Sequence, residues 1–385
     1  MIGSGTLRVA AVVGTRPEAI KMAPVIRALK SSRWCDCLVV GTAQHRELLD
    51  QALELFGISI DVDLNIMREG QSLSSLTARL FERLDGVFAE HKPDVILAQG
   101  DTTTVMVASI VAFYQGVPFG HVEAGLRTGD LHNPFPEEFN RIVAGTLATM
   151  HFAPTETAQK ALLSEGLAEE TIFVTGNTVV DALLDVASRP LQLPLPIPED
   201  HRLILMTAHR RENFGRPMEN IFRAVQRLVE RYPDVEVIYP VHPNPNVKAT
   251  AHAMLSGVPR VHLLEPLDYL SLVAVLKRSV LVLTDSGGIQ EEAPALAKPV
   301  LVMRIETERP EAVEAGVAKL IGTQEDMIVS EVGRLLDSPV AYNAMARSVS
   351  PYGDGKAAAR IVRIIAERFL LGVGASEAKP QAVPV

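Results

Sequence analysis

A glycine-containing segment in the second half of the chain carries residues suited to bind a phosphate. Residues 284–292 read Thr-Asp-Ser-Gly-Gly-Ile-Gln-Glu-Glu and follow an apolar run at Val280–Leu283. The small residues would leave backbone N–H groups uncovered at the start of a predicted helix, and such groups bind phosphate. Glu292 follows after about one helical turn, where its carboxylate could accept hydrogen bonds from sugar hydroxyls. The combination predicts a nucleotide-linked ligand.

A second segment of this kind lies near the other end of the chain. Residues 14–18 read Gly-Thr-Arg-Pro-Glu, and Lys21 follows in the next turn. Because proline favours the first turn of a helix, Arg16 and Lys21 are expected to point to the same helix start. A diphosphate clamp is one interpretation, since arginine gives paired planar contacts and lysine gives a point charge. An ordinary strand-to-helix turn with solvated charges is the alternative, and the motif alone favours neither.

Further ionisable residues follow other predicted strands. Asp101, in the segment Gly-Asp-Thr-Thr-Thr, is either a general base or orienting group or, with similar weight, a helix cap. Glu123 and Glu137 belong to a region with several ionisable groups, which favours a functional role over a structural one. His209 could protonate or bind a leaving phosphate, or it could be a strand-end histidine with satisfied hydrogen bonds. The histidines and carboxylates of 121–132 match no standard metal spacing, so no metal is expected.

Composition limits the classes of partner. The chain of 385 residues has a net charge of −9, so no basic surface indicates nucleic-acid binding. No signal peptide is recognised, and no apolar run of about 18 residues predicts a membrane span. Cys35 and Cys37 lie too close along one predicted strand to favour a disulfide, and they are expected to be reduced thiols in a cytoplasmic protein.

The elements that must position these residues alternate along the chain. Continuous Val, Ile and Leu runs followed by helical patterns are typical of strands buried on both faces of a parallel sheet. The predicted strands are Leu7–Val13, Cys37–Gly41, Val95–Ala98, Val117–Val122, His151–Ala153, Ile172–Val174, Leu203–Thr207, Val235–Val241, Val261–Leu264, Val280–Leu283, Pro299–Met303 and Lys319–Ile321. The proline-rich piece Pro190–Pro198 interrupts the alternation and is expected to be a linker. The chain is therefore predicted to be α/β, with two Rossmann-like doubly wound domains.

The linker and the alternation predict where the domains lie. The first domain is expected at residues 1–180 and the second at 181–355. A helix at about 356–371 is expected to pack back on the first domain, and the tail at 374–385 is expected to be disordered. Ligands of open parallel sheets bind beyond the carboxyl ends of the strands, where the ionisable residues above stand. Two domains facing each other at these ends would enclose a cleft.

Taken together, these segments resemble one family, the non-hydrolysing UDP-N-acetylglucosamine 2-epimerases. The resemblance spans roughly residues 7–370 and keeps the order of the segments. The matching segments are GTRPEAIKMAP (14–24), QHRELLDQ (44–51), LNIM (64–67), GDTTT (100–104), GHVEAGLRTGD (120–130), PFPEEFNR (134–141), VTGNTVVDALL (174–184), TAHRREN (207–213), TDSGGIQEEAPALAKPVLVMR (284–304) and TERPEA (307–312).

The resemblance implies a fold, partners and site residues. It implies a glycosyltransferase-B-like pair of Rossmann-type domains, with a UDP-binding second domain, a homodimer and no added cofactor. Carried over by motif, the catalytic set is Asp101, Glu123, Glu137 and His209. The set that contacts UDP is Arg16, Lys21, Ser286, Gly287, Gly288, Glu292 and Arg309.

The reaction of this family interconverts UDP-GlcNAc and UDP-ManNAc. Because the C2 proton of a sugar is weakly acidic, that proton and UDP are expected to leave together, which gives a 2-acetamidoglucal. Return of the proton to the other face, and of UDP to C1, inverts C2. This needs a base, an acid and cations on the departing diphosphate. Asp101 is expected to be the base, with Glu123 and Glu137 nearby and His209 on the phosphate. The product would supply ManNAc for cell-surface polysaccharide.

The chain also departs from the family pattern. Ile305 and Glu306 stand where many relatives read Asp-Thr or Glu-Thr, although Arg309 is retained. Some relatives are activated by a second UDP-GlcNAc, and part of that site is matched here by Gln44, His45, Gln71 and His242. Glu47 and Gly70 replace the Gln and Arg of allosteric relatives, so allosteric control stays open.

Three other functions remain as alternatives. A glycosyltransferase with the same scaffold would need an acceptor cleft or a membrane-facing basic patch, and the sequence shows neither clearly. A hydrolysing epimerase would release free ManNAc. A sugar-nucleotide sensor would bind UDP-GlcNAc without changing it, and the set of ionisable residues at strand ends argues against it.

Overall fold

The computed structural model describes residues 6–42, 46–68, 70–347 and 350–371, and these residues divide into two units. The first unit comprises the described residues of Met1–Ala182 and Gly353–Val385, and the second is Leu183–Tyr352. The proline-rich piece, 190–198, forms neither helix nor strand and lies in the second unit. The tail at 374–385 lies outside the described residues. Each unit is described by itself below.

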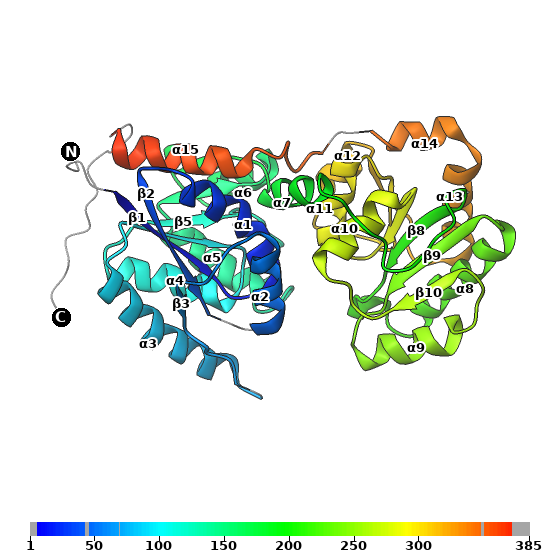
Figure 1. The fold of residues 1–385 in the computed structure, drawn as a ribbon, viewed down its shortest axis with the longest axis horizontal. Coiled ribbons are helices and arrows are strands. Elements are labelled where there is room, and N and C mark those ends of the chain that lie inside the picture. Colours follow the sequence, from blue (N-terminus) through cyan, green and yellow to red (C-terminus); the bar gives the residue numbers. More distant parts are fainter. Residues whose placement is uncertain (1–5, 43–45, 69, 348–349, 372–385) are drawn as a thin grey trace. The chain divides into compact units, whose positions relative to one another are not determined.

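Within the described part of the first unit, seven parallel strands form one sheet in the order β3-β2-β1-β4-β5-β6-β7 (Figure 1). The strands are β1 (Leu7–Val13), β2 (Cys35–Gly41), β3 (Val62–Asp63), β4 (Val95–Gln99), β5 (Phe119–Val122), β6 (Met150–Ala153) and β7 (Ile172–Val174). The helices are α1 (Arg16–Lys30), α2 (Arg46–Leu55), α3 (Leu73–His91), α4 (Thr103–Tyr114), α5 (Glu137–Leu147), α6 (Glu156–Ser164) and α15 (Ala357–Leu370). Helix α7 (Thr178–Ala187) begins in the first unit and ends in the second.

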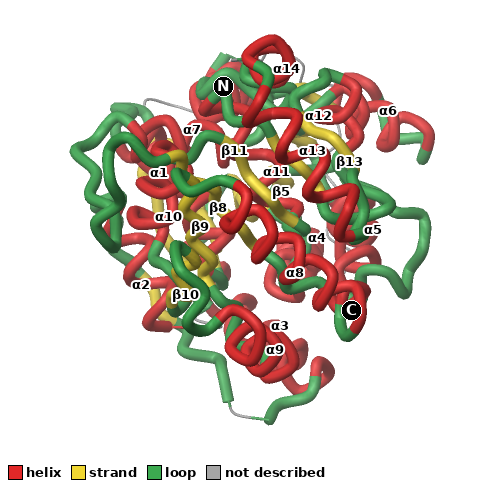
Figure 2. Tube along the Cα trace, turned by 90° about the vertical axis from the view of Figure 1, so that its right-hand side faces the viewer, coloured by secondary structure: helices red, strands yellow, loops and turns green. Residues whose placement is uncertain are grey.

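Among the described residues of the second unit, six parallel strands take the order β10-β9-β8-β11-β12-β13. The strands are β8 (Arg202–Thr207), β9 (Val235–Pro240), β10 (Val261–Leu264), β11 (Leu281–Thr284), β12 (Val300–Val302) and β13 (Ala318–Leu320). The helices are α8 (Arg216–Arg231), α9 (Pro245–Leu255), α10 (Tyr269–Arg278), α11 (Gly287–Glu292), α12 (Pro310–Glu314), α13 (Glu325–Asp337) and α14 (Pro339–Met345). Figure 2 shows helices flanking the strands.

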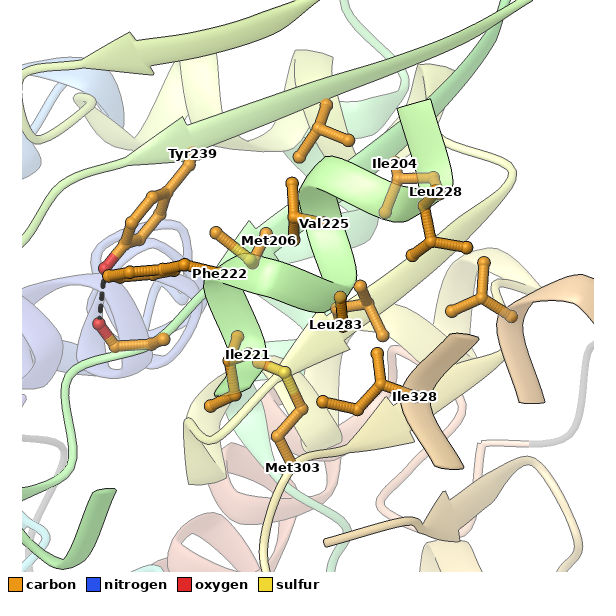
Figure 3. Packing of buried hydrophobic residues seen from close by; sticks show 14 of the residues in the cluster. Ile204, Met206, Ile221, Phe222, Val225, Leu228, Tyr239, Leu283, Met303 and Ile328 are labelled. Carbon is orange, nitrogen blue, oxygen red and sulfur yellow. Dashed lines mark hydrogen bonds between the residues drawn. The ribbon is translucent and has the colours of Figure 1, made fainter. Parts of the chain in front are cut away.

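Buried aliphatic side chains hold each sheet to its helices. Strands β1 and β4 are buried along almost their whole length, as expected of central strands covered on both faces. In the second unit, Phe222 and Leu228 of α8 are fully buried in a cluster that includes Tyr239 of β9 and Ile328 of α13 (Figure 3). In the first unit, α15 packs against α1 although the two helices lie at opposite ends of the chain. The predicted fold class, two doubly wound parallel α/β domains, is confirmed.

Both sheets reverse their strand order at one place. In the first sheet, β2 and β3 lie on one side of β1 and β4 lies on the other side. In the second sheet, β9 and β10 lie on one side of β8 and β11 lies on the other side. A ligand of a doubly wound sheet binds at such a switch point, beyond the carboxyl ends of the two strands. The turns that matter most are therefore those after β1, β4, β8 and β11. The two-residue strand β3 is absent from the predicted strands, since so short an element gives no periodic pattern.

Candidate functional site

The turn after β1 is built around a buried carboxylate. Thr15 caps α1, and Glu18 Oε2 accepts hydrogen bonds from the backbone N–H groups of Gly14 (2.6 Å) and Thr15 (2.8 Å). Together with the Thr15 side chain, which accepts from the Glu18 backbone N–H, this forms a capping box. A Cβ on Gly14 would lie 2.5 Å from Thr42 Oγ1, so the turn requires glycine there. Arg16, the first residue of α1, is half-buried at the mouth of this turn.

Glu18 also joins this turn to the one after β4. Thr102, which follows Asp101, donates its hydroxyl to Glu18 Oε1 at 2.5 Å. Burial raises the pKa of Glu18 to about 7, even though three hydrogen-bond donors favour the carboxylate form. One buried side chain therefore links the two turns of the switch point.

Asp101 is held by helix α5. Arg141 donates to Asp101 Oδ2 from Nη2 (2.7 Å) and Nε (2.9 Å), and Asn140 donates to the Asp101 backbone oxygen (2.8 Å). Both donors go to Oδ2, so Arg141 fixes the position of that oxygen. Asp101 is therefore held at the carboxyl end of β4 while part of its side chain stays accessible to a ligand.

Glu123 lies in a dense set of donors at the end of β5. The strand ends at Val122, and Glu123 takes a left-handed backbone conformation (φ 66°) that is uncommon for a residue with a side chain. Its carboxylate accepts from Lys21 Nζ, Gln99 Nε2 and Asn177 Nδ2, the last at 2.9 Å. The side chain is only 6% exposed. Lys21, predicted to contact a diphosphate, here pairs with this carboxylate.

Glu137 and Glu138 differ although they are neighbours in α5. Glu138 is buried, and its Oε1 accepts from the backbone N–H groups of Thr128 (2.9 Å) and Gly129 (3.0 Å). Successive helix residues point about 100° apart, and Glu137 is half-buried at the first turn of the helix. Glu138 therefore anchors the loop that precedes α5, and Glu137 is the member of the pair with accessible surface.

In the second unit, two arginine side chains lie beside Gly287 in the turn after β11. Ser286 caps α11 without a side-chain hydrogen bond, Gly287 is buried and Gly288 is exposed. A Cβ on Gly287 would lie 3.7 Å from Nη2 of Arg210 and 3.9 Å from Nη2 of Arg309. Two guanidinium groups therefore lie beside this turn, and they come from segments 99 residues apart along the chain. Charges of this sign suit a phosphate.

Buried partners hold two further predicted ligand-contacting residues in place. Arg309 Nε pairs with Glu291, whose side chain is 1% exposed. Glu292 is also buried, and its Oε1 accepts a hydrogen bond from the hydroxyl of Tyr269 at 2.8 Å. Glu291 and Glu292 thus contact different residues, because successive side chains of the short helix α11 point in different directions.

His209 follows β8 and is tied to the turn after β11 through Asp285. Asp285 is fully buried, and its Oδ2 accepts from the backbone N–H groups of His209 (2.8 Å) and Arg210 (2.9 Å) and from Asn213 Nδ2 (3.0 Å). Its Oδ1 lies 3.4 Å from His209 Nδ1. The His242 ring stacks on the His209 ring at 5.3 Å. Burial lowers the pKa of His209, while Asp285 raises it.

The residues predicted for an allosteric site are only partly described. Gln71, in the first unit, donates to the sulfur of Met67. His242, in the second unit, accepts from the backbone N–H of Asn244 and stacks on His209. Gln44 and His45 lie outside the described residues.

Sequence reasoning assigned no role to several side chains that position the site. Gln99 beside Glu123, and Arg210 and Asp285 beside the Gly287 turn and His209, were noted only as polar residues at predicted strand ends. The residues that were missed are Arg141 beside Asp101, Asn177 beside Glu123 and Tyr269 beside Glu292. Most of these residues lie inside the motifs quoted above, and membership of those motifs is the sequence feature that could have identified them. Across the described ranges, no group of three or more His, Cys, Asp and Glu side chains is placed to hold a metal ion. None of the helices described there is long and apolar enough to cross a membrane.

Comparisons with known proteins agree on one family. A family model described as UDP-N-acetylglucosamine 2-epimerase matches residues 27–366. The UDP-N-acetylglucosamine 2-epimerase of Escherichia coli (strain K12) is 52% identical over 369 residues, which span 93% of this chain and 98% of that protein. The crystal structure of UDP-GlcNAc 2-epimerase from Neisseria meningitidis bound to UDP-GlcNAc has a TM-score of 0.86 at 46% identity and covers 94% of this chain and 100% of that chain. The glycosyltransferase of kitacinnamycin, 14% identical with a TM-score of 0.63 over 93% of this chain and 99% of that chain, shares the fold.

Proposed function

Since the chain belongs to the UDP-N-acetylglucosamine 2-epimerase family, we propose that it interconverts UDP-GlcNAc and UDP-ManNAc. An epimerase is an isomerase, and the proposed route is elimination of UDP to a 2-acetamidoglucal followed by re-addition. The proposal extends to a biological role, the supply of ManNAc units for cell-surface polysaccharide, and to a cytoplasmic location.

One observation carries the proposal, namely two ion-paired carboxylates at adjacent strand ends. β4 and β5 are neighbours, so Asp101 and Glu123 follow strands that end at the same edge of the sheet. Inversion at C2 needs one group that removes a proton from one face and another that returns it to the opposite face. Asp101 is assigned as the base, because part of its side chain is accessible to a ligand, whereas the side chain of Glu123 is almost fully buried.

The second unit supplies the groups for the nucleotide. The Ser-Gly-Gly turn and the guanidinium groups of Arg210 and Arg309 are assigned to the diphosphate, and Glu292 to the sugar hydroxyls of the nucleoside. His209 is assigned to the leaving phosphate. Arg16 and Lys21 of the first unit stay predictions for contact with UDP, and Lys21 pairs with Glu123 in the structure. Cations at the diphosphate stabilise the negative charge that develops on UDP as the C1–O bond breaks.

A homodimer is also proposed, and exposed apolar side chains on the first unit support it. Helices α4 and α5 pack side by side. They expose Phe113 (55%), Tyr114 (73%), Phe139 (46%) and Ile142 (36%). Apolar patches on one face are common where a protein contacts a partner. Sedimentation equilibrium of the wild-type chain tests this, since a mass of one chain at micromolar concentration would contradict it.

The function is tested by proton NMR of UDP-GlcNAc incubated with the protein in D₂O. Deuterium at C2, together with UDP-ManNAc, is expected if the sugar loses and regains that proton. Free ManNAc would indicate a hydrolysing enzyme instead, and turnover only with an added acceptor would indicate a transferase. An unchanged spectrum, with binding measured separately, would contradict the epimerase and favour a sensor.

A further inference from the structure

The two oxygens of the Asp285 carboxylate have different surroundings. Oδ2 accepts the three hydrogen bonds that anchor residues 209–213. Oδ1 is buried and has no hydrogen-bond partner among the residues that the structure describes, although His209 Nδ1 lies 3.4 Å away. A buried carboxylate oxygen without a partner is costly. Anchoring of the turn accounts for the hydrogen bonds of Oδ2, but it does not account for the burial of Oδ1 beside His209.

We propose that Asp285 is a positioning residue that keeps the proton of the neutral His209 ring on Nδ1 and so presents Nε2 to the departing phosphate. This inference rests on the proposed function, in which His209 meets that phosphate. Asp285 forms no bond with the substrate. Nε2 takes a second proton from solvent, and the Nδ1–H group of the resulting imidazolium then closes on Asp285 Oδ1, which lies 3.4 Å away in the structure. The Nε2–H group donates a hydrogen bond to a phosphate oxygen of the departing UDP and keeps its proton.

Among the residues that the structure describes, three charged or titratable neighbours face the His209 ring, and one of these three favours the cation. Asp285 raises the pKa of His209, whereas His242 and Arg210 lower it. The His242 ring, stacked at 5.3 Å with an interplanar angle of 17°, also restricts tilting of His209. Loss of the Asp285 charge would therefore lower the pKa of His209 further and move its protonation to lower pH.

The substitution Asp285→Asn separates anchoring from positioning. The asparagine carbonyl oxygen can take the place of Oδ2, because three N–H donors converge there. Its amide group then stands in the place of Oδ1 and donates to His209 Nδ1, which forces the ring proton onto Nε2. The expected result is a nearly unchanged turn with the wrong tautomer of His209.

A matched control exists on the same turn. The Tyr239 hydroxyl donates a hydrogen bond to the backbone oxygen of Ala208 at 2.7 Å (Figure 3). This hydrogen bond supports the turn and does not involve the His209 ring. Tyr239→Phe is therefore expected to loosen the turn and lower the melting temperature, with the His209 tautomer and its pH dependence unchanged.

The test is long-range ¹⁵N–¹H NMR of protein labelled at histidine, with His209 assigned by the signal lost in His209→Gln. Without substrate, the wild type is expected to show the Nδ1–H tautomer and Asp285→Asn the Nε2–H tautomer. The kcat of Asp285→Asn is expected to fall about 10²-fold or more with little change in KM, and the pH-rate limb of His209 to move to lower pH.

Several outcomes decide between positioning and simple anchoring. An Nε2–H tautomer in the wild type would overturn the proposal, and so would an Asp285→Asn variant whose tautomer and pH profile match those of Tyr239→Phe. If Asp285→Asn does not fold, the wild-type tautomer alone decides. Absence of C2 exchange in the wild type would refute the proposed function, whereas the tautomer is read without substrate, so the two failures are distinguishable.

Discussion

Each unit places a buried carboxylate directly after a strand of its sheet, and the two carboxylates have different surroundings. Glu123 in the first unit shares its oxygens among three side-chain donors, one of them the ammonium group of Lys21. Asp285 in the second unit collects three N–H donors on one oxygen and turns the other toward a histidine. A buried carboxylate at a strand end therefore forms an ion pair in one unit and contacts an imidazole in the other.

The cations differ between the units in the same way. In the first unit, Lys21 and Arg141 each pair with a carboxylate of the candidate site. In the second unit, Arg210 and Arg309 reach the Gly287 turn, and Arg210 Nε is buried without a hydrogen-bond partner among the described residues. The comparison suggests that the first unit is suited to proton transfer and the second to holding an anion.

The comparison is tested most strongly by Glu123→Gln. Removal of the charge beside Lys21 is expected to lower kcat by about 10²–10⁴-fold, the usual contribution of a general acid or base. The control is Glu331→Gln, since Glu331 is a mostly buried carboxylate that pairs with Lys319 and Arg334 outside the candidate site. C2 exchange in D₂O measures both variants. Equal losses in the two variants would show that burial, and not chemistry, accounts for the effect.

Stability against pH should depend on Glu18 of the first unit. Burial raises its pKa from 4.5 to about 7, so the folded protein keeps a proton that the unfolded chain has lost between these values. The free energy of unfolding is therefore expected to fall as pH rises through about 7, by up to about 3 kcal/mol at 1.36 kcal/mol per pKa unit. Urea unfolding from pH 4.5 to 8 measures this slope. Glu18→Gln should abolish the slope, and an unchanged slope would refute the assignment.

Because the arginines of the two units have different partners, their substitution is expected to affect UDP binding differently. Arg210→Ala is expected to weaken UDP binding by about 10–100-fold, since a hydrogen bond to a charged group contributes roughly 1.5–3 kcal/mol. Arg141→Gln in the first unit is expected to lower kcat with a much smaller change in UDP affinity, because Arg141 holds Asp101. Calorimetric titration with UDP compares the two variants. A larger loss of affinity in Arg141→Gln would reverse the comparison.

A smaller effect is expected for Tyr269→Phe. The Tyr269 hydroxyl orients the buried carboxylate of Glu292, which is assigned to the sugar of the nucleoside. Its loss is expected to weaken UDP binding by about 3–10-fold, the range of one hydrogen bond. Binding of 2′-deoxy-UDP and UDP can be compared in both proteins. The preference for UDP should shrink in Tyr269→Phe if Glu292 contacts the ribose, and it should stay the same if Tyr269 only packs.

The sequence alone determined the class of fold, the family and the positions of the turns. Apolar runs such as Leu7–Val13 predict strands buried on both faces, because only a parallel sheet covered by helices removes so many aliphatic side chains from water. Pro17 predicts the first turn of a helix, and α1 begins at Arg16. These features depend on neighbours within a few residues, so local sequence carries them.

Only the tertiary structure decided which side chains meet. Glu123 pairs with Lys21, 102 residues away, and Asp101 is held by Arg141, 40 residues away. Such pairs depend on which strands become neighbours and on where each strand ends. A side chain one position later points in another direction, so Asp285 is fully buried while Ser286 is not. Burial and long-range pairing set the charge state and orientation of these groups, and neither can be read from residue type and spacing alone.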